Sequence, residues 1–240
     1  MQDRYTGDIG DYGKLGLLRA IAAGGLTVGV NWYLTPDESH NCDGRHTDYL
    51  RSEDYRSCDE KLWLELKQIV DTKNRFVRAL QKKQILDGTF FPDKLDFKGK
   101  SKEERKLIRD DWHDRALKKL NGLDVVFVDP DNGLLVKSAD GKPKENKFVR
   151  PEELEGYVKQ GSSVIYYQHK ARVKDEFYLD RHALLLERDA FRNCSGLCLK
   201  FKTTSQRFYF FIIQPRHRAV IERIVDGMLE TDWQCHFEKK

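Results

Sequence analysis

Acidic and amide side chains follow a strongly apolar run in the middle of the chain. Residues 123–128 read Leu-Asp-Val-Val-Phe-Val and the next five read Asp-Pro-Asp-Asn-Gly, so Asp129, Asp131 and Asn132 follow a predicted strand. The proline restrains the preceding aspartate to an extended backbone, and Asn-Gly is a strong turn signal. A carboxylate held in this way can accept hydrogen bonds from a substrate amine, or bind a hard cation together with Asp131. Alternatively, these side chains only cap backbone groups of a turn.

A second unusual string lies near the amino terminus, where residues 7–14 read Gly-Asp-Ile-Gly-Asp-Tyr-Gly-Lys. Glycines allow the backbone to approach a ligand closely, and Asp11 is expected to cap the helix that follows. The amino end of that helix favours anions. The string is neither a Walker loop nor a G-x-G-x-x-G fingerprint, because it precedes a helix but follows no strand. It makes Asp11 and Lys14 candidate site residues, and the alternative is a flexible entry to a capped helix.

Two further polar groups follow other predicted strands. The group after residues 26–34 supplies the candidates Thr35, Asp37, Glu38, Asp43 and His46. The group after residues 163–168 supplies His169 and Arg172. The two imidazoles are the best acid–base candidates, because they lie in loops beside acids and cations. Three other histidines fall in predicted charged helices and are expected to be solvated, namely His113, His182 and His217.

The elements that must position these groups alternate between helix and strand. Apolar residues at helical spacing predict helices at residues 14–23, 59–70, 74–84, 103–120, 151–160, 174–188 and 217–229. Strands are predicted at residues 26–34, 123–128 and 163–168, with a hairpin of residues 197–202 and 207–214. This order predicts an α/β, three-layer Rossmann-like fold whose mainly parallel sheet carries an antiparallel hairpin near the carboxyl terminus. Ligands of such sheets bind beyond the carboxyl ends of the strands, so the polar groups should share one crevice.

Composition bounds the class of protein. A length of 240 residues predicts a single domain, residues 1–240, in which residues 90–120 form a charged helical elaboration. No apolar stretch approaches the roughly 18 residues of a membrane span. The formal charge of +4 permits a polyanionic partner but does not demand one. Five cysteines without a C-x-x-C spacing, and a start that lacks an apolar signal segment, predict a reduced, cytoplasmic protein. Nothing in the sequence indicates the oligomeric state.

The order of these strings resembles the class I (Rossmann-like) methyltransferases, nearest the family that methylates adenine N6 in large-subunit ribosomal RNA. That family opens with a string ending in Asp-x-x-Lys before its first helix, similar to residues 11–14. Its catalytic strand ends in Asp-Pro-Pro-Tyr, where residues 129–132 read Asp-Pro-Asp-Asn. Its cofactor loop corresponds to residues 33–37, and its last strand to residues 210–215. The resemblance covers most of the chain in order and position, with weak identity.

The resemblance implies S-adenosylmethionine as cofactor and a nucleic acid or nucleotide as substrate. Asp129 would accept a hydrogen bond from an exocyclic amine, and Lys14 would lie near cofactor or substrate. The residues implied near the cofactor are Asp11, Thr35, Asp37 and Glu38. Two departures stand out: residues 35–38 lack the family's cofactor-loop glycine, and Asn132 replaces the aromatic residue that stacks on a flipped base.

Three functions fit the sequence. The first is a methyltransferase-like enzyme acting on a nucleic acid or nucleotide. The second is an enzyme dependent on Mg²⁺ or Mn²⁺ that acts on a phosphorylated or sugar-nucleotide substrate, since Asp129 and Asp131 match the Asp-x-Asp of nucleotide-sugar glycosyltransferases. There, Lys14 and Arg172 would hold phosphate. Further metal ligands or an acid–base pair would come from Asp8, Asp11, Asp43, His46 and His169, and His46, Asp43 and Arg172 are the candidate substrate-binding residues. The third is an inactive binding module that has kept the sheet.

Overall fold

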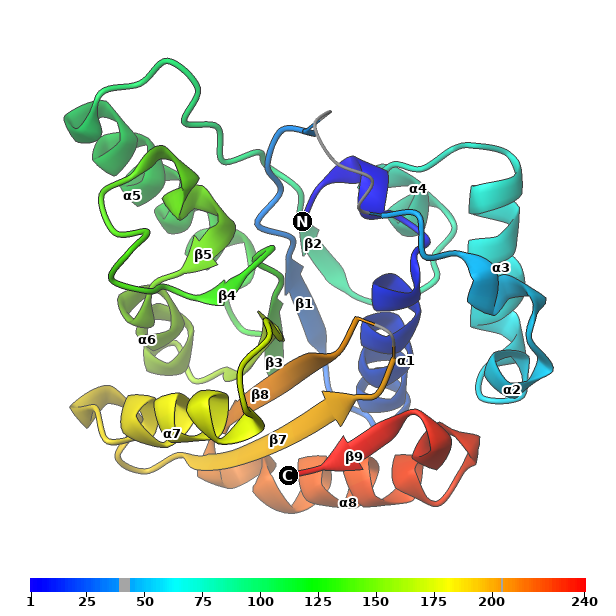
Figure 1. Cartoon of the computed structure of the whole chain (residues 1–240). Coiled ribbons are helices and arrows are strands. Elements are labelled where there is room, and N and C mark those ends of the chain that lie inside the picture. Colours follow the sequence, from blue (N-terminus) through cyan, green and yellow to red (C-terminus); the bar gives the residue numbers. More distant parts are fainter. Residues whose placement is uncertain (39–43, 204) are drawn as a thin grey trace.

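A mostly parallel sheet forms the centre of the computed structural model, which describes residues 1–38, 44–203 and 205–240 (Figure 1). Its strand order is β2-β1-β3-β6-β8-β7-β9. The strands are β1 (Val28–Asn31), β2 (Thr89–Phe91), β3 (Val125–Val128), β6 (Ser163–His169), β7 (Ser195–Phe201), β8 (Arg207–Ile213) and β9 (Phe237–Lys239). Strands β2, β1, β3 and β6 pair in parallel, whereas β8 runs antiparallel to both of its neighbours. The predicted Rossmann-like α/β fold with an antiparallel hairpin is confirmed. A separate parallel pair joins β4 (Gly133–Leu134) to β5 (Phe148–Val149).

Helices cover both faces of this sheet. The α-helices are α1 (Ile9–Ala23), α2 (Glu53–Arg56), α3 (Glu60–Asp71), α4 (Val77–Lys82), α5 (Lys102–Lys119), α6 (Pro151–Lys159), α7 (Asp175–Leu186) and α8 (Arg218–Leu229). Short 3-10 turns lie at Asp3–Tyr5, Asp48–Arg51, Pro143–Lys147, Asp189–Phe191, Pro215–His217 and Asp232–Cys235. One hydrophobic core contains side chains of α1, α3, α4 and α8, and the other contains side chains of α5, α6 and α7 (Figure 1). Alternate residues of β3 enter opposite cores, as the side-chain period of a strand requires.

Several sequence expectations need correction. No strand was predicted between residues 34 and 123, yet Thr89–Phe91 forms a parallel edge strand beside β1. Strand β9 pairs with β7 and has no counterpart among the predicted strands. Each covers only three residues, too few to show a period of their own, so their pairing depends on the neighbouring strand.

Two histidines expected to be solvated are buried. His182 is 6 % exposed and shares a hydrogen bond of 3.0 Å with the Tyr166 hydroxyl. His217 is 5 % exposed and lies 2.9 Å from Ser163 Oγ. Burial lowers the pKa of His182 to about 4, so this ring is neutral at physiological pH. Both rings connect a helix segment to the sheet.

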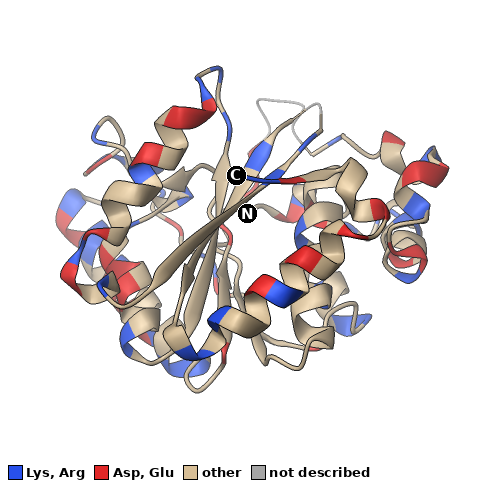
Figure 2. Ribbon diagram, turned by 90° about the horizontal axis from the view of Figure 1, so that it is seen from below, with Lys and Arg blue, Asp and Glu red and all other residues tan. Residues whose placement is uncertain are grey.

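The surface outside the cores carries both signs of charge. Figure 2 shows Lys and Arg interspersed with Asp and Glu along the helices around the sheet. None of the helices that the structure describes is both long and apolar enough to cross a membrane. The four cysteines within the described ranges are free thiols, namely Cys58, Cys194, Cys198 and Cys235.

A buried ion pair fastens α5 to α6. Arg109 is 1 % exposed, and its guanidinium donates to both carboxylate oxygens of Glu153, at 2.6 and 2.7 Å. It also donates to the carbonyls of Glu145 at 2.9 Å and Phe148 at 2.6 Å. Burial opposes ionisation of Glu153, but the guanidinium outweighs it and lowers the pKa of the carboxyl. The charged stretch of residues 90–120 therefore supplies a helix that is anchored to the rest of the fold. Trp112 and Ala116 of this helix are buried, whereas Leu107 is 68 % exposed.

Replacing Arg109→Met should lower the free energy of unfolding by about 3–5 kcal/mol, because Glu153 is left as an uncompensated buried charge. Lys106→Met on the exposed face of the same helix is the control, and it should change stability by less than about 0.5 kcal/mol. Urea unfolding at pH 7 measures both. Equal losses in the two variants would contradict a structural role for the Arg109 pair.

Candidate functional site

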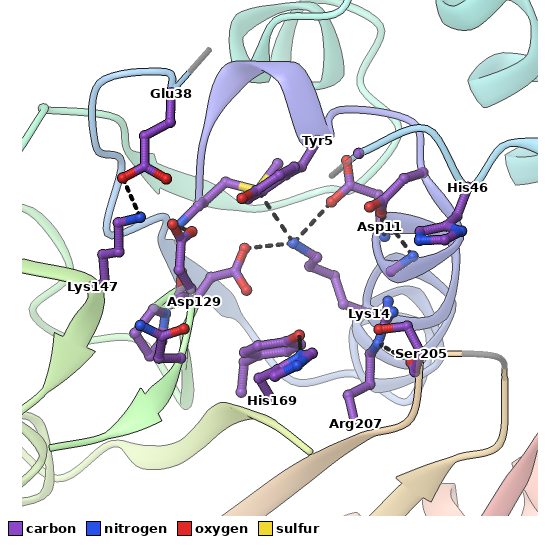
Figure 3. Close-up of a pocket in the computed structure, with 18 residues that line it drawn as sticks. Tyr5, Asp11, Lys14, Glu38, His46, Asp129, Lys147, His169, Ser205 and Arg207 are labelled. Atoms are coloured by element: carbon purple, nitrogen blue, oxygen red, sulfur yellow. Dashed lines mark hydrogen bonds and ion pairs between the residues drawn. The ribbon is translucent and has the colours of Figure 1, made fainter. Parts of the chain in front are cut away.

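A polar cavity lies at the topological switch point of the sheet. The chain passes from β1 to β2 on one side and returns to β3 on the other, so the switch point falls between the carboxyl ends of β1 and β3. Open α/β sheets bind ligands at this position. The cavity has a volume of about 370 Å³ and is lined by the amino-terminal segment, by the loops after β1, β3 and β6, and by the turn between β7 and β8 (Figure 3).

Lys14 is the centre of the polar contacts in this cavity. The residue is 4 % exposed, and its Nζ lies 2.8 Å from Asp11 Oδ1 and 2.5 Å from Asp129 Oδ2 (Figure 3). Asp11 Oδ2 in turn accepts from the Gly7 amide at 2.8 Å. The ammonium also lies 5.4 Å from the centre of the Trp32 ring. The two unusual strings of the sequence, one before α1 and one after β3, therefore meet at a single nitrogen atom.

The charges of this cluster stabilise one another. Burial raises the pKa of Asp129 and that of Asp11, and the Lys14 ammonium counters this without reversing it. Burial alone would lower the pKa of Lys14, but the two carboxylates outweigh it and raise the value. The lysine therefore stays charged, and the carboxylates are the members of the cluster that take up a proton as the pH falls.

Helix α1 begins five residues before the predicted position 14, and its N-cap is Asp8, not Asp11. The Asp8 side chain accepts from the amides of Gly10 at 2.8 Å and Asp11 at 3.1 Å. Glycines lower the helix propensity of residues 7–13, which conceals the helix start from a periodicity argument. Tertiary contacts override that propensity here, and the result is that Asp11 and Lys14 lie in the first turns of the helix and face the sheet.

The turn after β3 is held in place by its neighbours. Asp131 Oδ1 lies 2.5 Å from the Met1 amino nitrogen, and its Oδ2 accepts from Gln2 Nε2 at 2.9 Å. Burial opposes ionisation of Asp131, but the amino group outweighs it and lowers the pKa of the carboxyl. Gly133 has a φ of +98°, and a Cβ there would lie 2.3 Å from Gln168 Oε1. The same Gln168 side chain bonds both flanks of the turn, so the predicted Asn-Gly turn is confirmed and depends on glycine.

Other predicted residues also line the cavity. Glu38 forms an ion pair of 2.5 Å with Lys147, and His169 Nδ1 lies 3.4 Å from the Tyr167 hydroxyl. His46 lies on the opposite side, where its carbonyl accepts from the Ile9 amide at the start of α1. The structure thus brings together acids and imidazoles from all four polar groups.

Three of the described candidates do not line the cavity, and a fourth lies outside the described residues. Thr35 is 1 % exposed, and its amide donates to the Met1 carbonyl at 2.9 Å, so it is packed beneath the amino-terminal segment. Asp37 accepts from the Arg4 amide at 3.3 Å, outside the lining. Arg172 is exposed in the bend after β6. Asp43 lies outside the described residues.

Sequence reasoning missed Arg207, the first residue of β8. It is 4 % exposed and lines the cavity, and its Nε donates to the Ser205 carbonyl at 3.1 Å. The only signal in the sequence is an arginine that opens a strand of otherwise apolar residues, Arg-Phe-Tyr-Phe-Phe-Ile-Ile. A hairpin prediction alone gives no reason to place this side chain beside α1.

Comparison with known proteins yields no family model that matches the chain, no matching curated protein and no matching solved structure. The resemblance to methyltransferases is therefore carried by the residues of this chain alone. Within the described ranges, no group of three or more His, Cys, Asp or Glu side chains has the arrangement of a metal site. Asp129 and Asp131 instead face different cations, Lys14 and the Met1 amino group.

Replacing Lys14→Met should lower the free energy of unfolding by about 3–5 kcal/mol at pH 7, since it leaves two buried carboxylates unpaired. Their folded-state pKa values are then raised further above the unfolded values. A carboxyl group with a higher pKa in the folded than in the unfolded protein destabilises the folded state when it ionises. The free energy of unfolding therefore falls as the pH rises through the folded-state pKa. The loss in the variant should therefore be smaller at pH 5 than at pH 7.

Urea unfolding at the two pH values measures this difference. Lys67→Met, which removes an exposed partner of Asp71, is the matched control and should be nearly neutral at both. A loss in Lys14→Met that is the same at pH 5 and pH 7 would contradict the assigned coupling.

Proposed function

We propose that the protein binds a nucleotide in this cavity and presents an exocyclic amine of its base to Asp129. The observation that carries the proposal is the convergence of Asp11, Lys14 and Asp129 at the switch point. These residues come from the two strings on which the resemblance to adenine-N6 methyltransferases depends. A site for an amino-bearing base requires a charged hydrogen-bond acceptor. The string after β3 supplies the Asp129 carboxylate, and the string at the start of α1 supplies Lys14, whose ammonium favours the charged form of that carboxylate.

The hydrogen-bonding capacity around Asp129 suits an amine. Its Oδ2 accepts from Lys14, whereas Oδ1 accepts no hydrogen bond from any described residue, and Asp129 is one of the residues that line the cavity. A charged acceptor of this kind bonds an N–H group strongly. The neighbouring Asn132 amide also makes no side-chain hydrogen bond within the described ranges, and it offers both a donor and an acceptor. Tyr5 and Tyr167 add aromatic surface to the lining.

The residues after β1 do not fit S-adenosylmethionine at the place that the resemblance implies. Tyr33 and Thr35 are 0 % and 1 % exposed, because the amino-terminal segment packs on this loop. No glycine in residues 32–38 brings the backbone close to a ligand. We therefore derive no methyl-transfer step, and the proposal concerns recognition of the nucleotide at Asp129.

Cavity size and surface charge favour a small ligand over a polymer. A volume of about 370 Å³ falls within the range of small-molecule sites, roughly 300–1,000 Å³. Acidic and basic residues are interspersed along the outer helices, and the formal charge of the chain is only +4, so charge alone does not favour a polyanion (Figure 2).

The proposal predicts that adenosine monophosphate binds more tightly than inosine monophosphate, which carries a carbonyl in place of the amine. A hydrogen bond to a charged group contributes about 1.5–3 kcal/mol, so the preference should be about tenfold to hundredfold. Asp129→Asn should abolish it, because an amide can turn to serve either base. Isothermal titration of both nucleotides measures the preference.

The matched control is Asp71→Asn, which neutralises an exposed aspartate on α3 far from the cavity lining. It should keep the full preference. Equal affinity of the native protein for the two nucleotides, or a preference that survives Asp129→Asn, would overturn the proposed role of Asp129.

A further inference from the structure

Arg207 is a buried cation without a carboxylate partner in the part of the chain that the structure describes. It is 4 % exposed and belongs to none of the ion pairs formed by these residues. Its Nε donates to the Ser205 carbonyl, and its guanidinium carbon lies 6.0 Å from the centre of the Phe201 ring. Arginine is rarely so buried unless it is paired. The terminal nitrogens of this guanidinium donate to no residue that the structure describes. Burial alone would lower the pKa of Arg207, but its neighbours, which include the Asp8 and Asp11 carboxylates, outweigh it and raise the value.

The packing around Arg207 directs its guanidinium toward the cavity. Gly10 in the first turn of α1 lies against it, and a Cβ at Gly10 would be only 2.1 Å from Arg207 Nη1. The adjacent carboxylate of Asp8 is already used to cap α1. Figure 3 shows Arg207 beside Ser205, with its side chain rising from β8 toward the start of α1. The absence of a side chain at Gly10 is what leaves room for the guanidinium.

The two ends of the cavity offer different hydrogen-bonding groups. Arg207 and the positive end of the α1 dipole lie on one side, together with the Ser205 hydroxyl, the His46 ring and the carboxylates of Asp8, which caps α1, and Asp11, which pairs with Lys14. Asp129 and the turn after β3 lie on the other side, beyond Lys14 (Figure 3). A ligand that fits this pattern carries an anionic group at one end and a hydrogen-bond donor at the other.

We infer that Arg207 binds the phosphate of the nucleotide, so that the ligand is a nucleoside monophosphate with its phosphate at β8 and its base at Asp129. A guanidinium can donate two parallel hydrogen bonds to phosphate oxygens, which makes arginine well suited to this group. The assignment rests on the proposed function for the base end of the ligand. The assignment of the phosphate depends on Arg207 and Gly10, which have no part in the argument for Asp129, so it can be tested by itself.

Isothermal titration with adenosine monophosphate, adenosine and ribose 5-phosphate separates the two ends. The native protein should bind the monophosphate about tenfold to hundredfold more tightly than adenosine. Arg207→Gln should reduce that ratio to near one. Ribose 5-phosphate should bind the native protein and Asp129→Asn alike, and should not bind Arg207→Gln.

A second variant guards against misfolding of Arg207→Gln. Gly10→Ala keeps the charge, but its Cβ would displace the guanidinium and meet the Asp8 carboxylate, so the variant should also lose the preference for the monophosphate; its melting temperature and circular dichroism show whether it is folded. Gly227→Ala is the matched control, because a Cβ at this helical glycine meets no atom within 4 Å. It should bind all three ligands as the native protein does.

Equal affinity of the native protein for adenosine and its monophosphate would overturn the phosphate assignment. So would unchanged binding of ribose 5-phosphate in both Arg207→Gln and Gly10→Ala. If ribose 5-phosphate binding depends on Arg207 but the base adds no affinity, the phosphate site stands and the proposed function fails. A single-stranded oligonucleotide that binds more tightly than the monophosphate would overturn the assignment to a free nucleotide.

Discussion

The ammonium of Lys14, held between Asp11 and Asp129, is the interaction on which the site depends. Three buried charges are costly to remove from water, and they are tolerated only when their geometry is good. Here the distances of 2.8 and 2.5 Å bind the first turns of α1 to the carboxyl end of β3. Once α1 is fixed in this way, Asp8 caps it and Gly10 meets Arg207, so one wall of the cavity follows from the ion pair.

The remaining walls of the cavity come from the loops after β1, β3 and β6 and from the turn between β7 and β8. Parallel pairing of β1, β3 and β6 brings their carboxyl ends to one edge, and Gln168 on β6 fastens the turn that follows Asp129. The antiparallel hairpin then places Arg207 across from that turn. Asp129 and Arg207 therefore line one cavity from different strands of the sheet, as the proposed binding of an amine and a phosphate requires.

The sequence predicted the sheet and the part of the site that follows β3, but not the start of α1 or Arg207. The apolar run before Asp129 and the Asn-Gly turn are local signals, and they placed this carboxylate correctly at a strand end. The start of α1 was missed because its glycines fit close tertiary contacts and have low helix propensity: Gly10 lies against Arg207 of β8, and Gly13 lies against Phe201 of β7. Thr35 and Asp37 were wrongly predicted to line the cavity. Residues 1–5 pack on the loop that contains them, and a contact over this sequence distance leaves no local signal. Arg207 escaped notice for the same reason, since its partner Gly10 lies at the other end of the chain.

A crystal structure of the protein with bound adenosine monophosphate tests the central claim most directly. The geometry predicts the phosphate within hydrogen-bonding distance of the Arg207 guanidinium and the exocyclic amine within that distance of Asp129 Oδ1. Lys14 should remain between its two carboxylates, because the ligand uses the oxygen that Lys14 leaves open. A nucleotide bound in the reverse orientation, or outside this cavity, would contradict the claim.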